Sequence, residues 1–270
     1  MSLRIVQVPP ARGASWVLDS FALFFRRPLG FSLLFLVFLV AALVLMALPV
    51  VGALLLLALM PLLTLGFATA TRAAQQDQPV HAGLLFEPFR TGGDARRRQV
   101  LLRLCLLYAA LTALAMLLAH ALDGGAFERL QLLVAAQRTD ANQREIDAVL
   151  EEPGLAAGMF VRVALLGALA VPFWHAPMLV WWHGQGLAQA LFSSALACWR
   201  NKGAFVLYVL AWAGVSAGIG MLASVMVALL GAQQMIALTL PPVALLLSVA
   251  FYVSLYLVYA DCFAESDMPA

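Results

Sequence analysis

The residue types best suited to chemistry gather in one short stretch, where two histidines stand among tryptophans and prolines. His175 and His183 could each bind a metal ion or carry a proton. They are eight residues apart, whereas a helical metal pair is four apart, and neither belongs to a Glu-x-x-His motif. Tryptophans such as Trp174 concentrate at membrane–water interfaces. An aromatic belt therefore explains the stretch better than a metal or catalytic site, and we expect no catalytic residue, metal ion or cofactor.

The cysteines indicate no second site of this kind. Cys105, Cys198 and Cys262 are far apart in the sequence, and none belongs to a Cys-x-x-Cys pair. Neither a zinc site nor a redox pair is therefore indicated. We expect all three to be small buried apolar residues.

Two arginines lie inside long apolar runs, where a charged side chain is first considered functional. Arg103 and Arg162 each lie only a few residues from the end of their run, so each guanidinium can reach the headgroups by snorkelling. No Asp, Glu or Lys lies near the centre of any run. The intramembrane ionisable residues that are typical of an ion-coupled pump are therefore absent from the sequence. Snorkelling is the favoured interpretation for Arg162, and ligand binding is the alternative.

The last apolar run carries hydroxyl groups on one helical face. Ser248, Tyr252, Tyr256 and Tyr259 follow one another at steps of four, four and three residues. Hydroxyls in hydrocarbon need hydrogen-bond partners, so this face is expected to point into a helix bundle. It could line a polar cavity or pack internally, and internal packing is favoured.

A patch of small residues lies in the run before it. Gly214 and Gly218 form a Gly-x-x-x-Gly motif, with Ser216 and Gly220 close by. Such a patch lets another helix backbone approach closely. The partner could belong to this chain or to a second subunit.

The overall composition indicates the class of protein to which these residues belong. Of 270 residues, 64% are hydrophobic and 11% are charged, against about 25% charged in soluble proteins. With a mean hydropathy of +0.94, this excludes a disordered protein, a coiled coil and a disulfide-stapled secreted module. The net charge of +2 is too small to indicate a nucleic-acid partner. An all-α integral membrane protein is therefore predicted.

Six spans are predicted from uncharged runs, because about 20 apolar residues cross the hydrocarbon core. The first run, from Leu29 to Thr71, is long enough for two crossings and is interrupted at Pro49 and Gly52. A cleavable signal peptide is not expected, since this run is longer than a signal sequence allows. The expected spans are at about 29–48, 51–70, 100–121, 155–178, 204–230 and 236–260.

The distribution of basic residues predicts the orientation. With six crossings and a cytoplasmic N-terminus, only four of the sixteen Lys and Arg residues lie on the outer side, and twelve lie inside. The four outer residues are Arg129, Arg138, Arg144 and Arg162. The bacterial inner membrane, with both termini in the cytoplasm, is therefore the expected location.

The outer segment 123–153 is predicted to form two short amphipathic helices. Apolar residues recur in it at helical spacing, as in Phe127, Leu130 and Val134. It carries seven acidic residues and three arginines.

Two further amphipathic segments, 14–27 and 186–202, precede the first and fifth spans and are expected to lie in the membrane plane. A shift of 174 residues superimposes them, which suggests a parallel internal repeat of one in-plane helix and two spans. The shift pairs Ser15 with Gln189, Asp19 with Ser193, Ser20 with Ser194, Phe25 with Trp199, and Arg26 with Arg200.

Several segments together resemble a family of uncharacterised polytopic inner-membrane proteins of proteobacteria, known by locus tags. The resembling segments include Trp16–Pro28, Pro49–Gly52, Pro61–Gly66, Leu85-Phe86 with Phe89-Arg90, Ala176-Pro177, Arg200-Asn201 and Tyr259-x-Asp261-x-Phe263. The resemblance implies a helical inner-membrane protein and supplies no activity. His175 stands where the family pattern has an apolar aromatic residue.

The leading hypothesis is a single transmembrane domain, 1–270, that acts as a non-enzymatic membrane scaffold or assembly partner. The alternative is a transporter or a conduit for lipids or small molecules, with a cavity between the fourth and sixth spans; an intramembrane enzyme ranks third. Expected partners are membrane lipids and a membrane protein or second copy, with no nucleic acid. The candidate cavity or interaction residues are Arg162, Trp174, His175, Tyr252 and Tyr256, and the candidate packing residues are Gly214 and Gly218.

Overall fold

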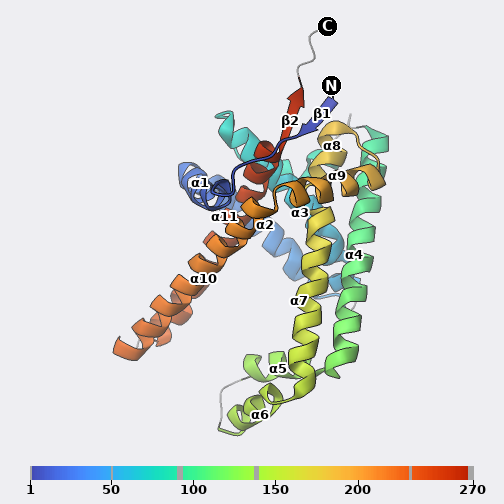
Figure 1. Ribbon diagram of the computed structural model, residues 1–270. Helices are drawn as coiled ribbons and strands as arrows, with labels where there is room; N and C mark the ends of the chain where they lie inside the picture. The colour runs from blue at the N-terminus through green and yellow to red at the C-terminus, as the bar shows by residue number, and fades with distance from the viewer. Residues whose placement is uncertain (1, 50, 90–93, 137–139, 231–232, 267–270) are drawn as a thin grey trace.

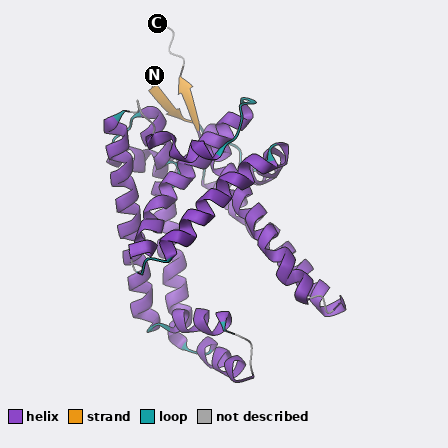
Figure 2. Cartoon of the chain, turned by 180° about the vertical axis from the view of Figure 1, so that it is seen from behind, coloured by secondary structure: helices purple, strands orange, loops and turns teal. Residues whose placement is uncertain are grey.

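The computed structural model describes residues 2–49, 51–89, 94–136, 140–230 and 233–266, and most of these are helical (Figures 1 and 2). Six of the helical stretches are long and apolar enough to cross a membrane, which confirms the all-α membrane fold. The elements are β1 (Ser2–Ile5), α1 (Arg12–Arg26), α2 (Pro28–Met46), α3 (Val51–Gln75), the 3-10 helix η1 (Ala82–Phe89), α4 (Ala95–Asp123), α5 (Ala126–Ala135), α6 (Asp140–Leu150), α7 (Pro153–Phe173), α8 (Ala176–His183), α9 (Leu187–Arg200), α10 (Lys202–Leu230), α11 (Gln233–Cys262) and β2 (Phe263–Ser266).

Local sequence explains several of the helix ends. Pro28 occupies the first turn of α2, where its missing N–H costs nothing. The Asp94 carboxylate caps α4 by accepting a hydrogen bond from the backbone N–H of Arg96 at 2.8 Å. Gly124 and Gly125 have φ of 58° and 81°, values that favour glycine, and they turn the chain between α4 and α5.

The core lies where α1, α3, α8 and α11 meet, with α4 packed along its side. Trp16, Phe67, Leu179 and Val253 contribute fully buried side chains from these four helices. Figure 1 shows α1, α8, α9 and both strands at one end of the molecule and α5 and α6 at the other. The core is thus concentrated toward the end that carries the two termini.

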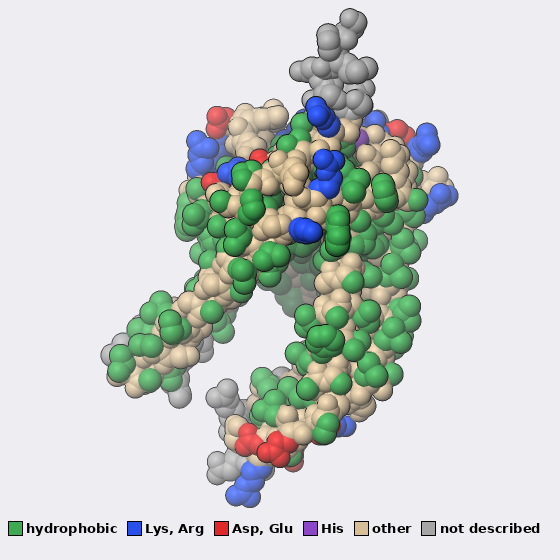
Figure 3. All heavy atoms as spheres, in the orientation of Figure 1, with side chains coloured by type: hydrophobic (Ala, Val, Ile, Leu, Met, Phe, Trp, Pro, Cys, Tyr) green, Lys and Arg blue, Asp and Glu red, His purple; other side chains and the backbone are tan. Residues whose placement is uncertain are grey.

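Two arms extend from this core and diverge (Figures 1 and 2). One arm contains α4 and α7, which pack along each other and carry α5 and α6. The other contains α10 and the first part of α11. Figure 3 shows that apolar side chains cover both arms and that the space between the arms is open on this face.

The termini form a two-stranded antiparallel sheet, in which Ser2 lies opposite Ser266 and Ile5 opposite Phe263. Four-residue strands give too few alternating positions for a period of two to be recognised, so the sequence did not predict this sheet. The pairing brings both ends of the chain to the same end of the molecule.

Helix α1, which covers nearly all of the amphipathic segment 14–27, packs much of its apolar face against protein. Trp16, Val17 and Phe24 are buried, and α1 packs on α10 and α11. The large hydrophobic residues that it exposes are Leu18 and Phe25. An apolar face is stabilised by burial against protein as well as by lipid, and here neighbouring helices supply the surface. Placement of α1 and α9 in the membrane plane stays a prediction.

The predicted repeat also stays a prediction, although two observations agree with it. Adding 174 to the first residue of α2, Pro28, gives the first residue of α10, Lys202. The same shift relates buried positions of α1 to the buried positions of α9. These pairs are Trp16 and Ala190, Ser20 and Ser194, Leu23 and Ala197, and Phe24 and Cys198.

The fourth predicted span, 155–178, is interrupted in the structure. Helix α7 ends at Phe173, and α8 begins at Ala176 after a break at Trp174 and His175. Pro177 disfavours helical geometry in the residue before it and lacks an N–H to donate. In the outer segment the structure has helices α5 and α6, and residues 137–139 between them lie outside the described residues.

Candidate functional site

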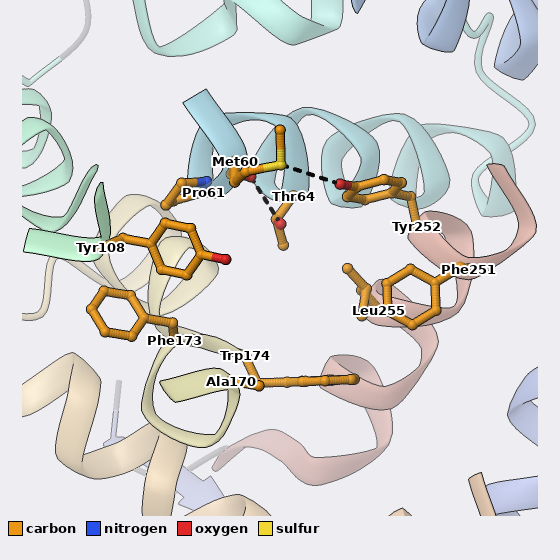
Figure 4. Close-up of a pocket in the computed structure, with 10 residues that line it drawn as sticks. All are labelled: Met60, Pro61, Thr64, Tyr108, Ala170, Phe173, Trp174, Phe251, Tyr252 and Leu255. Carbon is orange, nitrogen blue, oxygen red and sulfur yellow. Dashed lines mark hydrogen bonds between the residues drawn. The ribbon is translucent and has the colours of Figure 1, made fainter. Parts of the chain in front are cut away.

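Tyr252 and Trp174 line the same cavity, which lies between α3, α4, α11 and the end of α7 (Figure 4). The cavity has a volume of about 200 Å³. Figure 4 shows the Tyr108 hydroxyl directed toward its interior. The lining residues are Met60, Pro61, Thr64, Tyr108, Ala170, Phe173, Trp174, Phe251, Tyr252 and Leu255.

The hydroxyl groups at this cavity are largely satisfied by the protein. Tyr252 donates to the Met60 sulfur at 3.7 Å, and Thr64 donates to the Met60 carbonyl at 3.1 Å. The Tyr252 ring stacks on Phe67, with 5.0 Å between the ring centroids. The lining contains no charged side chain. The arrangement can hold water or a very small molecule, and the lining residues include no Asp, Glu, His, Lys, Arg or Cys.

Tyr256 is one helical turn beyond Tyr252 but lines a different pocket, of about 230 Å³, near the strands. The Arg72 guanidinium lies over the Trp182 ring there, 5.3 Å from its centroid. His183 Nε2 and the Tyr259 hydroxyl form a hydrogen bond of 2.6 Å beside it. The tyrosines on this face of α11 therefore line two separate pockets.

His175 lies in the protein core. Its side chain is fully buried, and neither ring nitrogen has a hydrogen-bond partner among the residues that the structure describes. The ring packs against Phe263, with 5.2 Å between centroids, and its backbone N–H donates to Ser194 Oγ at 3.0 Å. The backbone break at this position turns the ring inward, and the surroundings favour a packing role.

Arg162 does not snorkel, because it forms a buried ion pair. Its guanidinium lies 3.2 Å from the Asp123 carboxylate, and the two side chains are 7% and 0% exposed. It also lies over the Phe127 ring, 4.0 Å from the centroid. Gly158 permits this approach, since a Cβ there would lie 2.5 Å from that of Asp123. The sequence assigned Asp123 to the outer loop, because no local pattern links residues 39 positions apart.

Three side chains beside Arg162 have the types and spacing of metal ligands. The ligand atoms of His120, Asp123 and Glu128 lie within 4.8 Å of one another. Arg162 pairs with Asp123 and lies 3.8 Å from Glu128, and His120 Nδ1 lies 3.0 Å from Glu128. Because the Arg162 guanidinium already faces both carboxylates, the cluster is better described as an ion-pair network than as a metal site.

A second polar cluster, which the sequence did not predict, joins α1 to the end of α11. The Asp261 carboxylate accepts hydrogen bonds from Arg12 Nε at 2.5 Å and from the Trp16 indole at 2.7 Å. Arg12 also pairs with Asp19 at 3.0 Å. The hydrogen bond to Asp261 raises the pKa of the Arg12 guanidinium, which keeps its charge.

Asn201 joins three further segments of the chain and is 2% exposed. Its side-chain carbonyl accepts from the Val8 N–H at 2.8 Å, and its amide donates to the Val6 and Ala197 carbonyls. The contacts fix the segment after β1 against α9. Since Val6 and Val8 are almost 200 residues away from Asn201 along the chain, sequence spacing gave no signal for these two contacts.

The packing glycines Gly214 and Gly218 lie on the exposed part of α10. A Cβ added at either position would meet no atom within 4 Å. The described part of this chain therefore supplies no helix that uses their small size. The candidate residues Arg162, His175, Tyr252 and Tyr256 likewise occupy four different environments and do not converge on one site.

Comparison with known proteins identifies one full-length relative. A Burkholderia thailandensis protein named "Probable inner membrane protein" is 31% identical over 265 residues, which cover 98% of this chain and 96% of the relative. No protein-family model matches the chain. No solved structure matches it. With six helices long enough to span a membrane, the chain belongs to the same family of polytopic inner membrane proteins as the Burkholderia protein.

Proposed function

We propose that this protein is a non-enzymatic membrane scaffold, in which α10 packs against a transmembrane helix of another chain. The supporting observation is the exposure of α10 within its own fold. In its most hydrophobic stretch only 6% of the residues are buried, against 44% in α3 and in α11. From Val209 to Leu229 none of its residues is buried.

Exposed apolar helices in membrane proteins are mostly covered by lipid, so exposure alone does not indicate a protein partner. The glycines on this surface are the feature that indicates one. Gly214, Gly218 and Gly220 have open space where a Cβ would stand. In a bilayer, small residues favour association because they let two helix backbones approach closely. A partner from outside this chain, either a second copy or another membrane protein, would use that surface.

The geometry gives less support to a conduit. The cavity beside the fourth and sixth spans has a volume of about 200 Å³, below the roughly 300–1,000 Å³ of ligand pockets. Its lining is largely aromatic and aliphatic, and two of its three hydroxyls, those of Thr64 and Tyr252, donate to Met60. An enzyme is less favoured still, because the candidate residues do not form a catalytic group.

The scaffold has both termini in the cytoplasm in this proposal, as the distribution of arginines predicts. Pairing of β1 with β2 agrees with termini on one side of the membrane. Membrane lipids surround the two arms, and no nucleic acid is involved.

Capture of differently tagged copies, together with identification of other captured proteins, tests the proposal. Gly214→Leu and Gly218→Leu should each lower recovery of the partner several-fold, because a leucine separates the backbones. Phe160→Leu on α7 is the matched control, since it alters another lipid-exposed residue, 75% exposed, away from α10. Unchanged recovery in both glycine variants would contradict the proposal. Recovery of the second tag distinguishes a homo-oligomer from a different partner.

A further inference from the structure

A groove lies between α7 and α10 where the two arms separate, beneath α9. It has a volume of about 570 Å³, larger than the cavity beside Tyr252 and within the range of ligand pockets. We call it the α7–α10 groove; its walls include Gly167 and Val171 on α7 and Val206 and Leu210 on α10. Figure 3 shows the opening between the arms, with basic side chains above it.

The walls of the α7–α10 groove suit a hydrocarbon chain. Val171, Val206 and Leu210 are 39%, 57% and 59% exposed, although each belongs to a membrane-spanning helix. No acidic side chain lines the groove. Because the groove opens sideways between two spans, molecules dissolved in the bilayer can reach it without crossing water.

The roof of the groove carries one cation, Lys202, at the first position of α10. Its Nζ lies 5.0 Å from the centroid of the Trp199 ring, which holds the ammonium beside the groove. Among the described residues, Lys202 forms no ion pair with a carboxylate. Trp199 is 71% exposed, as tryptophans at membrane interfaces are.

The Cys198 thiol, another polar group in the groove, adds no charge beside Lys202. Cys198 also lines the groove, and burial raises the pKa of its thiol to about 12, so the thiol stays neutral. It donates to the Val171 carbonyl at 3.6 Å. The ammonium of Lys202 is therefore the single charge presented to an occupant by the residues that line the groove.

Because the α7–α10 groove combines apolar walls with a single ammonium group, we propose that it binds one anionic phospholipid of the surrounding bilayer. An acyl chain lies along Val206 and Leu210, and the phosphate of the headgroup contacts Lys202. At about 100° per residue, Gly218 is turned around α10 by roughly 120° from Val206 and roughly 80° from Leu210, whereas Gly214 is turned by only about 40° from Leu210. The lipid site and the proposed scaffold surface therefore adjoin on α10, and separate measurements test them.

Native mass spectrometry of the full-length protein tests this site. The protein is delipidated in detergent and offered equal amounts of palmitoyl-oleoyl phosphatidylglycerol and phosphatidylcholine. The wild-type protein should retain one phosphatidylglycerol in preference to phosphatidylcholine. Lys202→Gln should lower that preference about fivefold, which corresponds to ~1 kcal/mol for one basic residue near a membrane surface, and Lys202→Arg should restore it.

A second variant blocks the groove without removing charge. A Cβ at Gly167 meets no atom within 4 Å, so Gly167→Leu places its side chain in the groove without a clash. It should reduce retention of both lipids. Gly186→Leu is the matched control outside the groove, since a Cβ there also meets no atom within 4 Å, and it should bind lipid as the wild type does. Circular dichroism establishes that each variant is helical.

Two results would overturn the proposal. Equal retention of the two lipids by the wild-type protein, or an unchanged preference in Lys202→Gln, excludes a headgroup contact at Lys202. Full retention of phosphatidylglycerol by Gly167→Leu excludes the groove as the binding site. Neither result depends on capture of a protein partner, so the lipid site and the scaffold can fail separately.

Discussion

Replacement of Asp261 by alanine should destabilise the joint between α1 and α11. The carboxylate accepts a hydrogen bond from the Trp16 indole, whose side chain is fully buried. An unpaired buried donor costs about 1–3 kcal/mol. Loss of the partly exposed Arg12 ion pair adds about 0.2–1 kcal/mol. We therefore expect the free energy of unfolding to fall by about 1–4 kcal/mol, measured by tryptophan fluorescence as a denaturing detergent is added to mixed micelles.

Two substitutions separate these contributions. Asp261→Asn keeps a carbonyl that can accept from Trp16, so it should lose only the contribution of the charge, about 1 kcal/mol or less. Asp19→Ala removes the other carboxylate that contacts Arg12, and Asp19 is 47% exposed, so its effect should also stay below about 1 kcal/mol. The reasoning is refuted if Asp261→Ala is no more destabilising than Asp19→Ala.

Three further results are expected. Arg162→Met leaves the Asp123 carboxylate buried without its ion-pair partner, so it should lower the free energy of unfolding by about 3–5 kcal/mol in the same assay. Adding Asp123→Asn should recover part of that lost stability, and no recovery would contradict the pairing. Gly13→Ala should force α1 away from α10, because the new Cβ would lie 1.9 Å from the Ala204 carbonyl oxygen. It should therefore destabilise the protein more than Gly186→Ala, whose Cβ meets no atom within 4 Å. Equal effects of the two substitutions would show that the contact between α1 and α10 is loose. A reporter enzyme active only outside the cytoplasm should be active when fused after Ala136 and inactive after Gln78, and the reverse pattern would invert the topology.

The sequence predicted those features that depend on local composition. Apolar runs of about 20 residues located the six helices of the described chain that are long and apolar enough to span, because bilayer thickness fixes the length of a spanning helix. Pro172 and Pro177 can be recognised in the sequence as residues that interrupt a helix, and the structure breaks the helix beside them, between Phe173 and Ala176. These features need no knowledge of which helices become neighbours.

Features that depend on neighbours could not be predicted in this way. Amphipathic spacing revealed the apolar face of α1, but the same spacing suits a protein core and a lipid surface. Arg162 was therefore assigned to the headgroups and its partner Asp123 to a loop, although they form a buried pair. Asp261 and Trp16 are 245 positions apart, and only the packed fold brings them together.

The most direct test of the scaffold is photo-crosslinking from the surface of α10 in intact membranes. Met221 lies two turns beyond Gly214 on the same face, and Val209 lies on the opposite side from Gly218. Their side chains are 70% and 59% exposed, so each position accepts a photoreactive amino acid. We predict one discrete protein adduct from position 221 and lipid adducts from position 209. Only lipid adducts at both positions would contradict a role in assembly through this face of α10.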